Sequence, residues 1–269
     1  MEFPFSKHRL NVLVWFLKRP ALYKQFVREI FSFFLRTQHP SLLKSKDAEA
    51  WCKSLALDEE SALKLFKKDF QFIEITEKYS IIIEDSQRLV NAKKFDWGGR
   101  GNISLNYNLA NLINAQSIIE TGVAYGWSSL SLLLSLSERE VGMLTSIDMP
   151  FWGTENEQDI GMVVPQNLRD RWRMVRLADR DAIPKISKEN EFFDLCHYDS
   201  DKSYGGKMWA LPRLWDMIKA DGILVCDDIS DNLAFKDFSI KKGLAPIIVE
   251  TYDTHVFKYV GLLKKPSFA

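Results

Sequence analysis

Five short apolar runs alternate with helical patterns over residues 117–226, and this alternation limits the fold more than any other feature of the chain. The runs lie at residues 117–121, 144–148, 172–177, 193–198 and 223–226. Strands joined by helical crossovers pair in parallel, so the pattern predicts an open α/β sheet. Two further runs, 246–250 and 257–263, predict an antiparallel hairpin at the sheet edge and bring the predicted strands to seven.

The region before residue 96 has a different pattern. Apolar residues recur there at spacings of three and four, which is typical of helices. The predicted helical stretches are 10–17 and 22–34, which Pro20 interrupts, then 48–55, 59–68 and 77–93. A turn rich in glycine, residues 96–101, separates them from the sheet. We therefore divide the chain into a helical N-terminal extension, residues 1–95, and an α/β domain, residues 96–269.

The composition is that of a folded protein. With 269 residues, 46% hydrophobic and 27% charged, the chain is neither disordered nor collagen-like. Cys52, Cys196 and Cys226 give no disulfide framework and no paired metal-ligand spacing, which favours a reducing, cytoplasmic compartment. The apolar run 10–17 meets basic residues instead of a cleavage site and is too short to span a membrane.

Charge is distributed unevenly along the chain. The total is zero, which argues against nucleic acid as a partner, but residues 1–46 carry +7, residues 47–95 carry −2 and residues 96–269 carry −5. The leader 1–46 is thus a basic amphipathic segment. Such a segment can lie on an anionic membrane surface, pack on the acidic domain or form a homodimer interface, and we favour the last two.

The turn after the first predicted strand is a candidate cofactor site. Ligands of open α/β sheets bind outside the carboxyl ends of the strands. Glycine allows the backbone to approach a ligand closely, and the amides that begin the next helix attract an anion. The candidate contacts in this turn are Glu120, Gly122, Ala124, Tyr125, Gly126 and Ser128.

The same turn indicates which ligand it suits. A dinucleotide loop needs a small residue where Trp127 stands, so NAD and FAD are disfavoured. Glu120 is suited to an ammonium group, while the loop amides and Ser128 suit a carboxylate. S-adenosylmethionine carries both groups. A structural turn without a ligand is the alternative interpretation.

Acidic residues also end the next two predicted strands. Asp148 ends the second strand, where a carboxylate can accept both hydroxyls of a ribose. Ala178 and Asp179 end the third, where a carboxylate and nearby amides can recognise the adenine amine. Acidic residues are common at strand ends, but their occurrence in order on consecutive strands favours an adenosine ligand.

Three carboxylates at the ends of the fourth and fifth strands predict a metal site. Asp199 ends the fourth strand and Asp227 and Asp228 end the fifth. Neighbouring strands lie about 4.8 Å apart, and clustered carboxylates repel one another unless a cation bridges them. Oxygen ligands favour magnesium, with manganese or calcium as alternatives. The competing interpretation is that Asp227 and Asp228 only cap the following turn.

Lys202 is the candidate general base. It follows Asp199 by three residues and can act on an acceptor hydroxyl if its pKa is lowered. An exposed lysine in a salt bridge is the alternative. His197 lies inside the fourth strand and is interpreted as a packed core residue.

These segments together resemble the class I S-adenosylmethionine-dependent methyltransferases, over about residues 96–265. The turn 120–128 looks like the cofactor loop of the catechol O-methyltransferase type and of bacterial relatives near the cephalosporin-hydroxylase group. The segments 193–204 and 222–228 are similar to the second half of that pattern. The resemblance implies a Rossmann-like, mostly parallel seven-stranded sheet with an antiparallel C-terminal hairpin.

The resemblance also implies roles for single residues. The cofactor positions are Glu120, Gly122, Ser128, Asp148 and Asp179, the magnesium positions are Asp199, Asp227 and Asp228, and the catalytic lysine is Lys202. Two positions depart from the pattern: the catechol enzyme has asparagine at the position of Asp228, and the bacterial relatives often have histidine at that of Lys202. The implied reaction is methyl transfer to an oxygen, with a sugar hydroxyl favoured over a phenol.

The acceptor is not identified by the sequence. The long segment 150–172 is expected to form a lid, and its Phe151 and Trp152, with Trp97 and Tyr125, are candidates for an acceptor pocket. Two other classes of function stay open. One is a nicotinamide-dependent oxidoreductase, and the other is a catalytically silent protein that docks through its leader.

Overall fold

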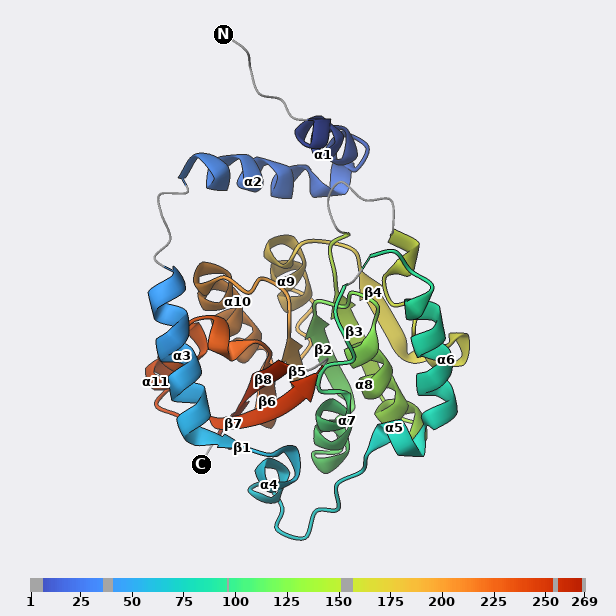
Figure 1. Cartoon of the computed structure of the whole chain (residues 1–269), viewed down its shortest axis with the longest axis vertical. Helices are drawn as coiled ribbons and strands as arrows, with labels where there is room; N and C mark the ends of the chain where they lie inside the picture. Colours follow the sequence, from blue (N-terminus) through green and yellow to red (C-terminus); the bar gives the residue numbers. More distant parts are fainter. Residues whose placement is uncertain (1–6, 36–40, 96, 151–156, 254–255, 268–269) are drawn as a thin grey trace.

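A computed structural model describes residues 7–35, 41–95, 97–150, 157–253 and 256–267. Its centre is an eight-stranded sheet in the order β1-β7-β8-β6-β5-β2-β3-β4, with helices on both faces (Figure 1). The strands are β1 Ala56–Leu57, β2 Ser117–Thr121, β3 Met143–Ile147, β4 Trp172–Val175, β5 Phe193–Tyr198, β6 Ile218–Cys226, β7 Ile247–Asp253 and β8 Val256–Lys264. The predicted α/β fold is confirmed.

Strands β2 to β6 pair in parallel, and β8 runs antiparallel to both β6 and β7. All seven predicted strands are present. The eighth, β1, pairs in parallel with β7 and belongs to the N-terminal extension. It was missed because two residues are too few to show an alternating pattern.

Helices surround this sheet. The principal ones are α1 Lys7–Leu17, α2 Tyr23–Leu35, α3 Ser41–Leu55, α4 Glu59–Lys64, α5 Ile75–Lys78, α6 Ser80–Asn91, α7 Ile103–Leu112, α8 Trp127–Glu138, α9 Asp179–Ser187, α10 Tyr204–Asp216 and α11 Ala234–Lys242. No helix in the described residues is long and apolar enough to cross a membrane.

The central strands are buried on both faces, as crossover helices require. Alternate side chains enter opposite cores: Ile118 and Leu195 belong to one cluster, while Ile119 and Cys196 belong to the other. This alternation holds the strands in register and aims their carboxyl ends at one edge of the sheet.

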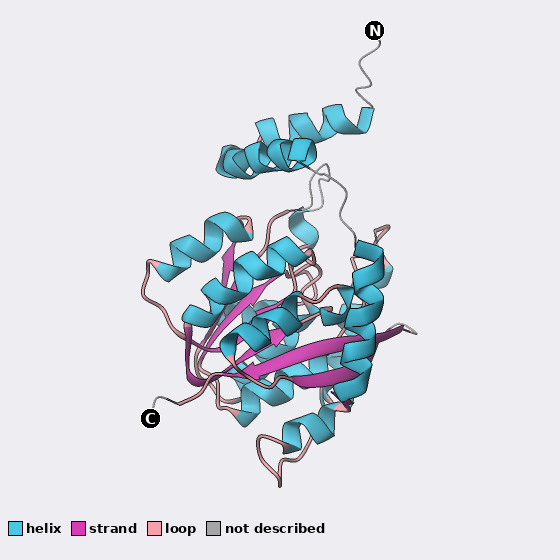
Figure 2. Ribbon diagram, turned by 90° about the vertical axis from the view of Figure 1, so that its left-hand side faces the viewer, coloured by secondary structure: helices cyan, strands magenta, loops and turns pink. Residues whose placement is uncertain are grey.

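The N-terminal extension takes part in two different packings. Leu63, Ile75 and Ile83 are buried in the same core as the sheet. Helices α1 and α2 instead lie together at one end of the molecule, where Phe26 packs against a small cluster that includes Phe16 (Figure 2). The division of the chain at residue 95 stays a prediction.

Candidate functional site

Two cavities adjoin at the carboxyl edge of the sheet. The larger has a volume of about 450 Å³ and lies between the ends of β2 and β3, the start of α9 and helix α2. Among the predicted cofactor residues, it is lined by Gly122, Ala124, Asp148, Ala178 and Asp179. The smaller has a volume of about 100 Å³ and lies between residues 97–102, the start of α8 and the ends of β5 and β6.

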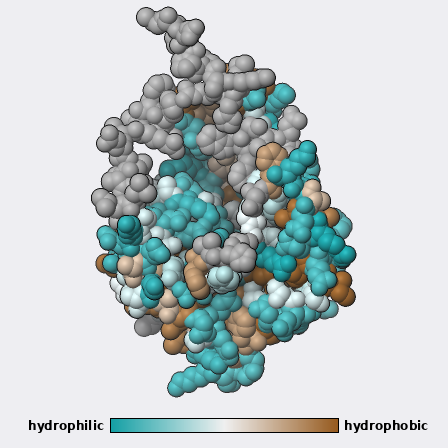
Figure 3. All heavy atoms as spheres, viewed as in Figure 1, coloured by the Kyte–Doolittle hydropathy of each residue, from teal (hydrophilic) through white to brown (hydrophobic). Residues whose placement is uncertain are grey.

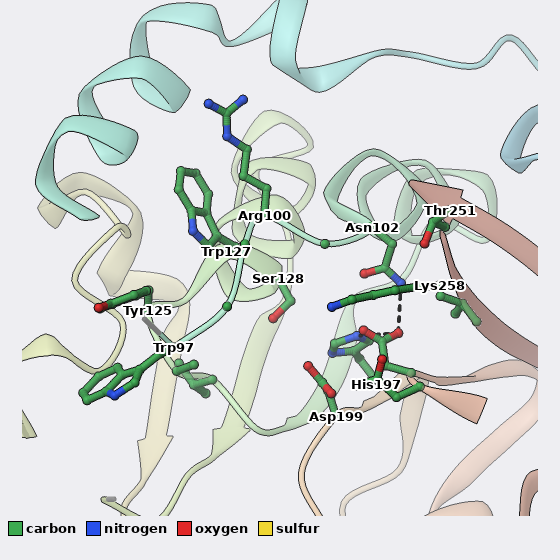
Figure 4. Close-up of a pocket in the computed structure, with 18 of the residues that line it drawn as sticks. Trp97, Arg100, Asn102, Tyr125, Trp127, Ser128, His197, Asp199, Thr251 and Lys258 are labelled. Atoms are coloured by element: carbon green, nitrogen blue, oxygen red, sulfur yellow. Dashed lines mark hydrogen bonds and ion pairs between the residues drawn. The ribbon is translucent and has the colours of Figure 1, made fainter. Parts of the chain in front are cut away.

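The two cavities share a wall. The residues that line both are Trp97, Val123, Ala124, Asp199 and Lys202. In the smaller cavity, Trp97, Tyr125 and Trp127 lie on one side and Asn102, His197, Asp199 and Lys258 on the other, with Ser128 between them (Figure 4). A ligand in one cavity therefore meets a ligand in the other beside Asp199 and Lys202.

The turn between β2 and α8 has the backbone geometry that its glycines predict. Gly122 and Gly126 have φ values of +82° and +96°, in the left-handed region that disfavours other residues. A Cβ atom on Gly122 would lie 2.2 Å from the carbonyl oxygen of Asp199. Gly122 is therefore needed for direct contact between this turn and the end of β5.

Asp148 lies behind this turn. Its Oδ2 accepts hydrogen bonds from the amides of Val123 and Ala124, both at 2.9 Å. Burial raises the pKa of Asp148 to about 6, although these two amides oppose the shift. The predicted contact between these amides and a ligand carboxylate is thus replaced by a bond to Asp148 in the protein itself.

Asp179 begins helix α9 on the other side of the larger cavity. It accepts a hydrogen bond from the hydroxyl of Ser200, in the loop after β5. Burial raises the pKa of Asp179 to about 6, and the charge of Asp148 adds to the shift. Two carboxylates at the ends of neighbouring strands thus face one cavity, as the sequence predicts.

Glu120 has different partners from those expected. It is fully buried and accepts hydrogen bonds from Ser129 at 2.5 Å and from Ser146 at 2.7 Å. It lines neither cavity, so the structure does not support direct contact with a cofactor ammonium. Ser128 and Tyr125 line the smaller cavity, where the Tyr125 ring stacks on Trp97 with centroids 5.0 Å apart.

The predicted magnesium site is not formed in the described part of the chain. Asp199 and Asp228 both face the ammonium of Lys202, whereas Asp227 accepts a hydrogen bond from Asn102 at 2.9 Å. No group of three metal-ligating side chains converges among the described residues. A cation of the chain itself, Lys202, faces two of the three carboxylates here, and magnesium binding stays a prediction.

The role of Lys202 as general base stays a prediction, and its surroundings oppose it. Burial disfavours its charged form, but the neighbouring Asp199 and Asp228 outweigh burial and raise the pKa of Lys202 above its ordinary value. A base must be unprotonated, and this lysine is held protonated. Burial and the charge of Asp227 raise the pKa of Asp199, so the carboxyl group is the better proton acceptor of the two.

His197 is buried, as predicted, but it contacts charges. Its Nδ1 lies 3.6 Å from Glu120 and its Nε2 lies 3.6 Å from Asp227. Burial disfavours the charged imidazole, but these two carboxylates outweigh burial and raise the pKa of His197 to about 10. His197 and Lys202 thus both lie against the carboxylates of the site.

Comparison with known proteins agrees with this geometry. Residues 119–229 match the model of a family described as a methyltransferase domain. This segment is therefore similar to methyltransferase domains. The comparison with curated proteins gave no match.

Solved structures similar to this chain share its fold at low identity. Cofactor-bound Rv0187 from MTB has a TM-score of 0.56 at 14% identity, over 70% of this chain and 90% of that chain. An O-methyltransferase from Bacillus cereus in complex with SAH has a TM-score of 0.52 at 14% identity, over 80% and 100%. The O-methyltransferase TomG from Streptomyces achromogenes, in complex with SAM, has a TM-score of 0.50 at 14% identity, over 85% and 100%.

Several residues around the two cavities were not singled out from the sequence. Asn102 orients Asp227, and the buried Lys207 donates to the backbone carbonyls of Asp227 and Asp228 at 3.2 and 2.5 Å. Gln25 and Glu29 of α2 line the larger cavity. Of the site residues without a predicted role, His197 is one that the sequence could have indicated. Side chains alternate along a strand, so His197 lies on the same side of β5 as Asp199.

The expected acceptor aromatics have different outcomes. Trp97 and Tyr125 line the smaller cavity. Phe151 and Trp152 lie outside the described residues, and the predicted lid falls partly there.

Proposed function

We propose that this chain transfers a methyl group from S-adenosylmethionine to a hydroxyl oxygen of a small molecule or sugar. The observation that carries the proposal is the pair of adjoining cavities, with Asp199 and Lys202 in their shared wall. One cavity has half-buried carboxylates at successive strand ends, and the other is polar. The larger volume of about 450 Å³ lies within the range of roughly 300–1,000 Å³ that is usual for small-molecule sites.

The residues present fit S-adenosylmethionine. Asp148 has one oxygen fixed by the turn amides, which orients the carboxylate to accept the ribose hydroxyls. Asp179 and the backbone at Ala178 suit the adenine. Ser128, in the first turn of α8, suits the carboxylate of the amino-acid end, which would reach past the shared wall into the smaller cavity that Ser128 lines. When bound, the cofactor supplies a methyl group on a positively charged sulfur.

The acceptor hydroxyl would lie in the smaller cavity beside the shared wall. Its oxygen forms a bond to the methyl carbon as the carbon–sulfur bond breaks, and its proton passes to the carboxylate of Asp199. The ammonium of Lys202, next to Asp199, stabilises the negative charge that develops on the oxygen. Holding donor and acceptor in line contributes about 7–11 kcal/mol in favourable cases.

Two further observations support the proposal. Two of the solved structures with the same fold are O-methyltransferases that hold SAM or its product SAH. The three cysteines are buried and free, which fits a reaction in the cytoplasm.

Calorimetric titration of the full chain with S-adenosylmethionine tests donor binding. Asp148→Asn should weaken binding, whereas Asp69→Asn, which changes an exposed carboxylate far from both cavities, should not. Transfer of labelled methyl groups to a panel of sugars and phenols tests the reaction. Asp199→Asn should keep donor binding and lose transfer. A chain that binds NADH and not S-adenosylmethionine would contradict the proposal.

A further inference from the structure

Helix α2 turns an apolar side away from the protein. Tyr23, Val27, Ile30 and Phe31 follow helical spacing and so share one side of the helix. All four are exposed, Val27 by 49% and Phe31 by 62%. An amphipathic helix on a globular protein normally hides its apolar side in the core, so this arrangement is reversed.

Contacts on the opposite side hold the helix in this orientation. Phe26 stacks near Phe16, with ring centroids 4.9 Å apart. Arg28 donates to both carboxylate oxygens of Asp181, and Glu29 lines the larger cavity. Rotating α2 to bury its apolar side would break these contacts, so the exposed side is a fixed part of the surface.

The exposed charges near this side are all positive. Within residues 11–31, the exposed charged side chains are Lys18 and Lys24, and the single acidic residue, Glu29, faces the cavity. Lys24 precedes Val27 by three residues and Phe31 by seven, so it borders the apolar side. Over the body of the molecule, the surface in view is instead mostly hydrophilic (Figure 3).

We infer that the outer side of α2 docks on an anionic phospholipid surface. Apolar side chains enter the boundary between headgroups and acyl chains, while lysines at the rim meet lipid phosphates. A second copy of the chain is a poorer partner, because a symmetric contact through this side brings two Lys24 side chains together. An acidic protein surface would satisfy Lys24 but place carboxylates against Val27 and Phe31.

Vesicle flotation of the full chain tests the inference. The protein should float with vesicles of phosphatidylcholine and phosphatidylglycerol, stay unbound with phosphatidylcholine alone, and be released by salt. Val27→Asp and Phe31→Asp should abolish flotation, and both positions are exposed, so the fold should be kept. Lys24→Glu should weaken binding on the order of tenfold.

The matched control is Ile240→Asp on α11, which changes an apolar side chain that is 65% exposed. It should float as the unchanged protein does. The inference is overturned if the full chain does not bind anionic vesicles, or if Val27→Asp and Phe31→Asp bind equally well. It is also overturned if light scattering shows a dimer that these two substitutions dissociate. None of these outcomes depends on methyl transfer.

Discussion

Arg28 of α2 donates two hydrogen bonds to the carboxylate of Asp181 in α9, at 2.8 and 2.6 Å. This fork-shaped pairing joins the N-terminal helices to the helix that begins with Asp179, a wall of the larger cavity. The basic leader is thus tied to the side of the domain where the nucleoside is proposed to bind.

Arg28→Ala should loosen α2. The ion pair is partly exposed, so its loss should speed amide hydrogen exchange in α2 by up to roughly fivefold and leave the sheet unchanged. S-adenosylmethionine affinity should fall as well, because Gln25 and Glu29 lose their fixed place on the cavity wall. Lys24→Ala on the same helix is the control. Unchanged exchange in Arg28→Ala would show that the hydrophobic cluster alone holds the helix.

Donor binding should strengthen as the pH rises. Asp148 and Asp179 have pKa values raised to about 6, and only their ionised forms accept two hydroxyl or amine hydrogens. Affinity should fall by roughly tenfold for each group from about pH 7 to about pH 5. Calorimetry in buffers of different ionisation enthalpy should detect release of protons on binding near pH 6. A donor affinity that does not change with pH would show that these carboxylates do not contact the donor.

The same two groups make the unliganded fold less stable as the pH rises. Their ordinary pKa is 3.8, so between about pH 4 and 6 the folded chain holds protons that the unfolded chain has released. Folding is therefore favoured at the lower end of this window. Urea unfolding of Asp148→Asn should show a weaker dependence on pH over that range.

Gly122→Ala should lower the free energy of unfolding by more than backbone strain alone would. A left-handed φ alone costs an alanine about 1–2 kcal/mol. At Gly122 the added methyl group also meets the backbone of Asp199, so the free energy of unfolding should fall further and donor binding should be lost. Gly243→Ala isolates the strain, because Gly243 has a φ of +67° and nothing within 4 Å of its would-be Cβ. Equal losses in both variants would contradict the close contact.

Magnesium should not stabilise the unchanged protein. Lys202 neutralises Asp199 and Asp228. Added Mg²⁺ should therefore change the melting temperature and the donor affinity no more than sodium chloride of equal ionic strength does. In Lys202→Ala the two carboxylates lose their cation, and Mg²⁺ should then raise the melting temperature. A magnesium-dependent rise in the unchanged protein would restore the metal site.

The fold followed from the sequence to a large extent because its strands are continuous apolar runs. Parallel strands bring their carboxyl ends to one edge, which also put Asp148 and Asp179 beside one cavity without knowledge of the loops. Only β1 was missed. Its two residues become a strand through pairing with β7, nearly two hundred residues later in the chain, and no local pattern records that contact.

The carboxylate cluster was less predictable because strand spacing fixes backbone positions and not side-chain directions. Asp227 is turned by Asn102, which comes from a segment 125 residues earlier. His197 was interpreted as an ordinary core residue because its partners, Glu120 and Asp227, come from the two neighbouring strands. Charges that meet only across strands are not visible in a single stretch of sequence.

The C-terminal hairpin contributes side chains to only one of the two cavities. Thr251 of β7 and Lys258 and Val260 of β8 line the smaller cavity, and none of the three lines the larger one. Under the proposed function, changes at these positions alter which alcohol is recognised and leave the larger cavity as it is. A library of variants at Thr251 and Lys258 is then a direct way to change the acceptor, since every member keeps the same methyl source.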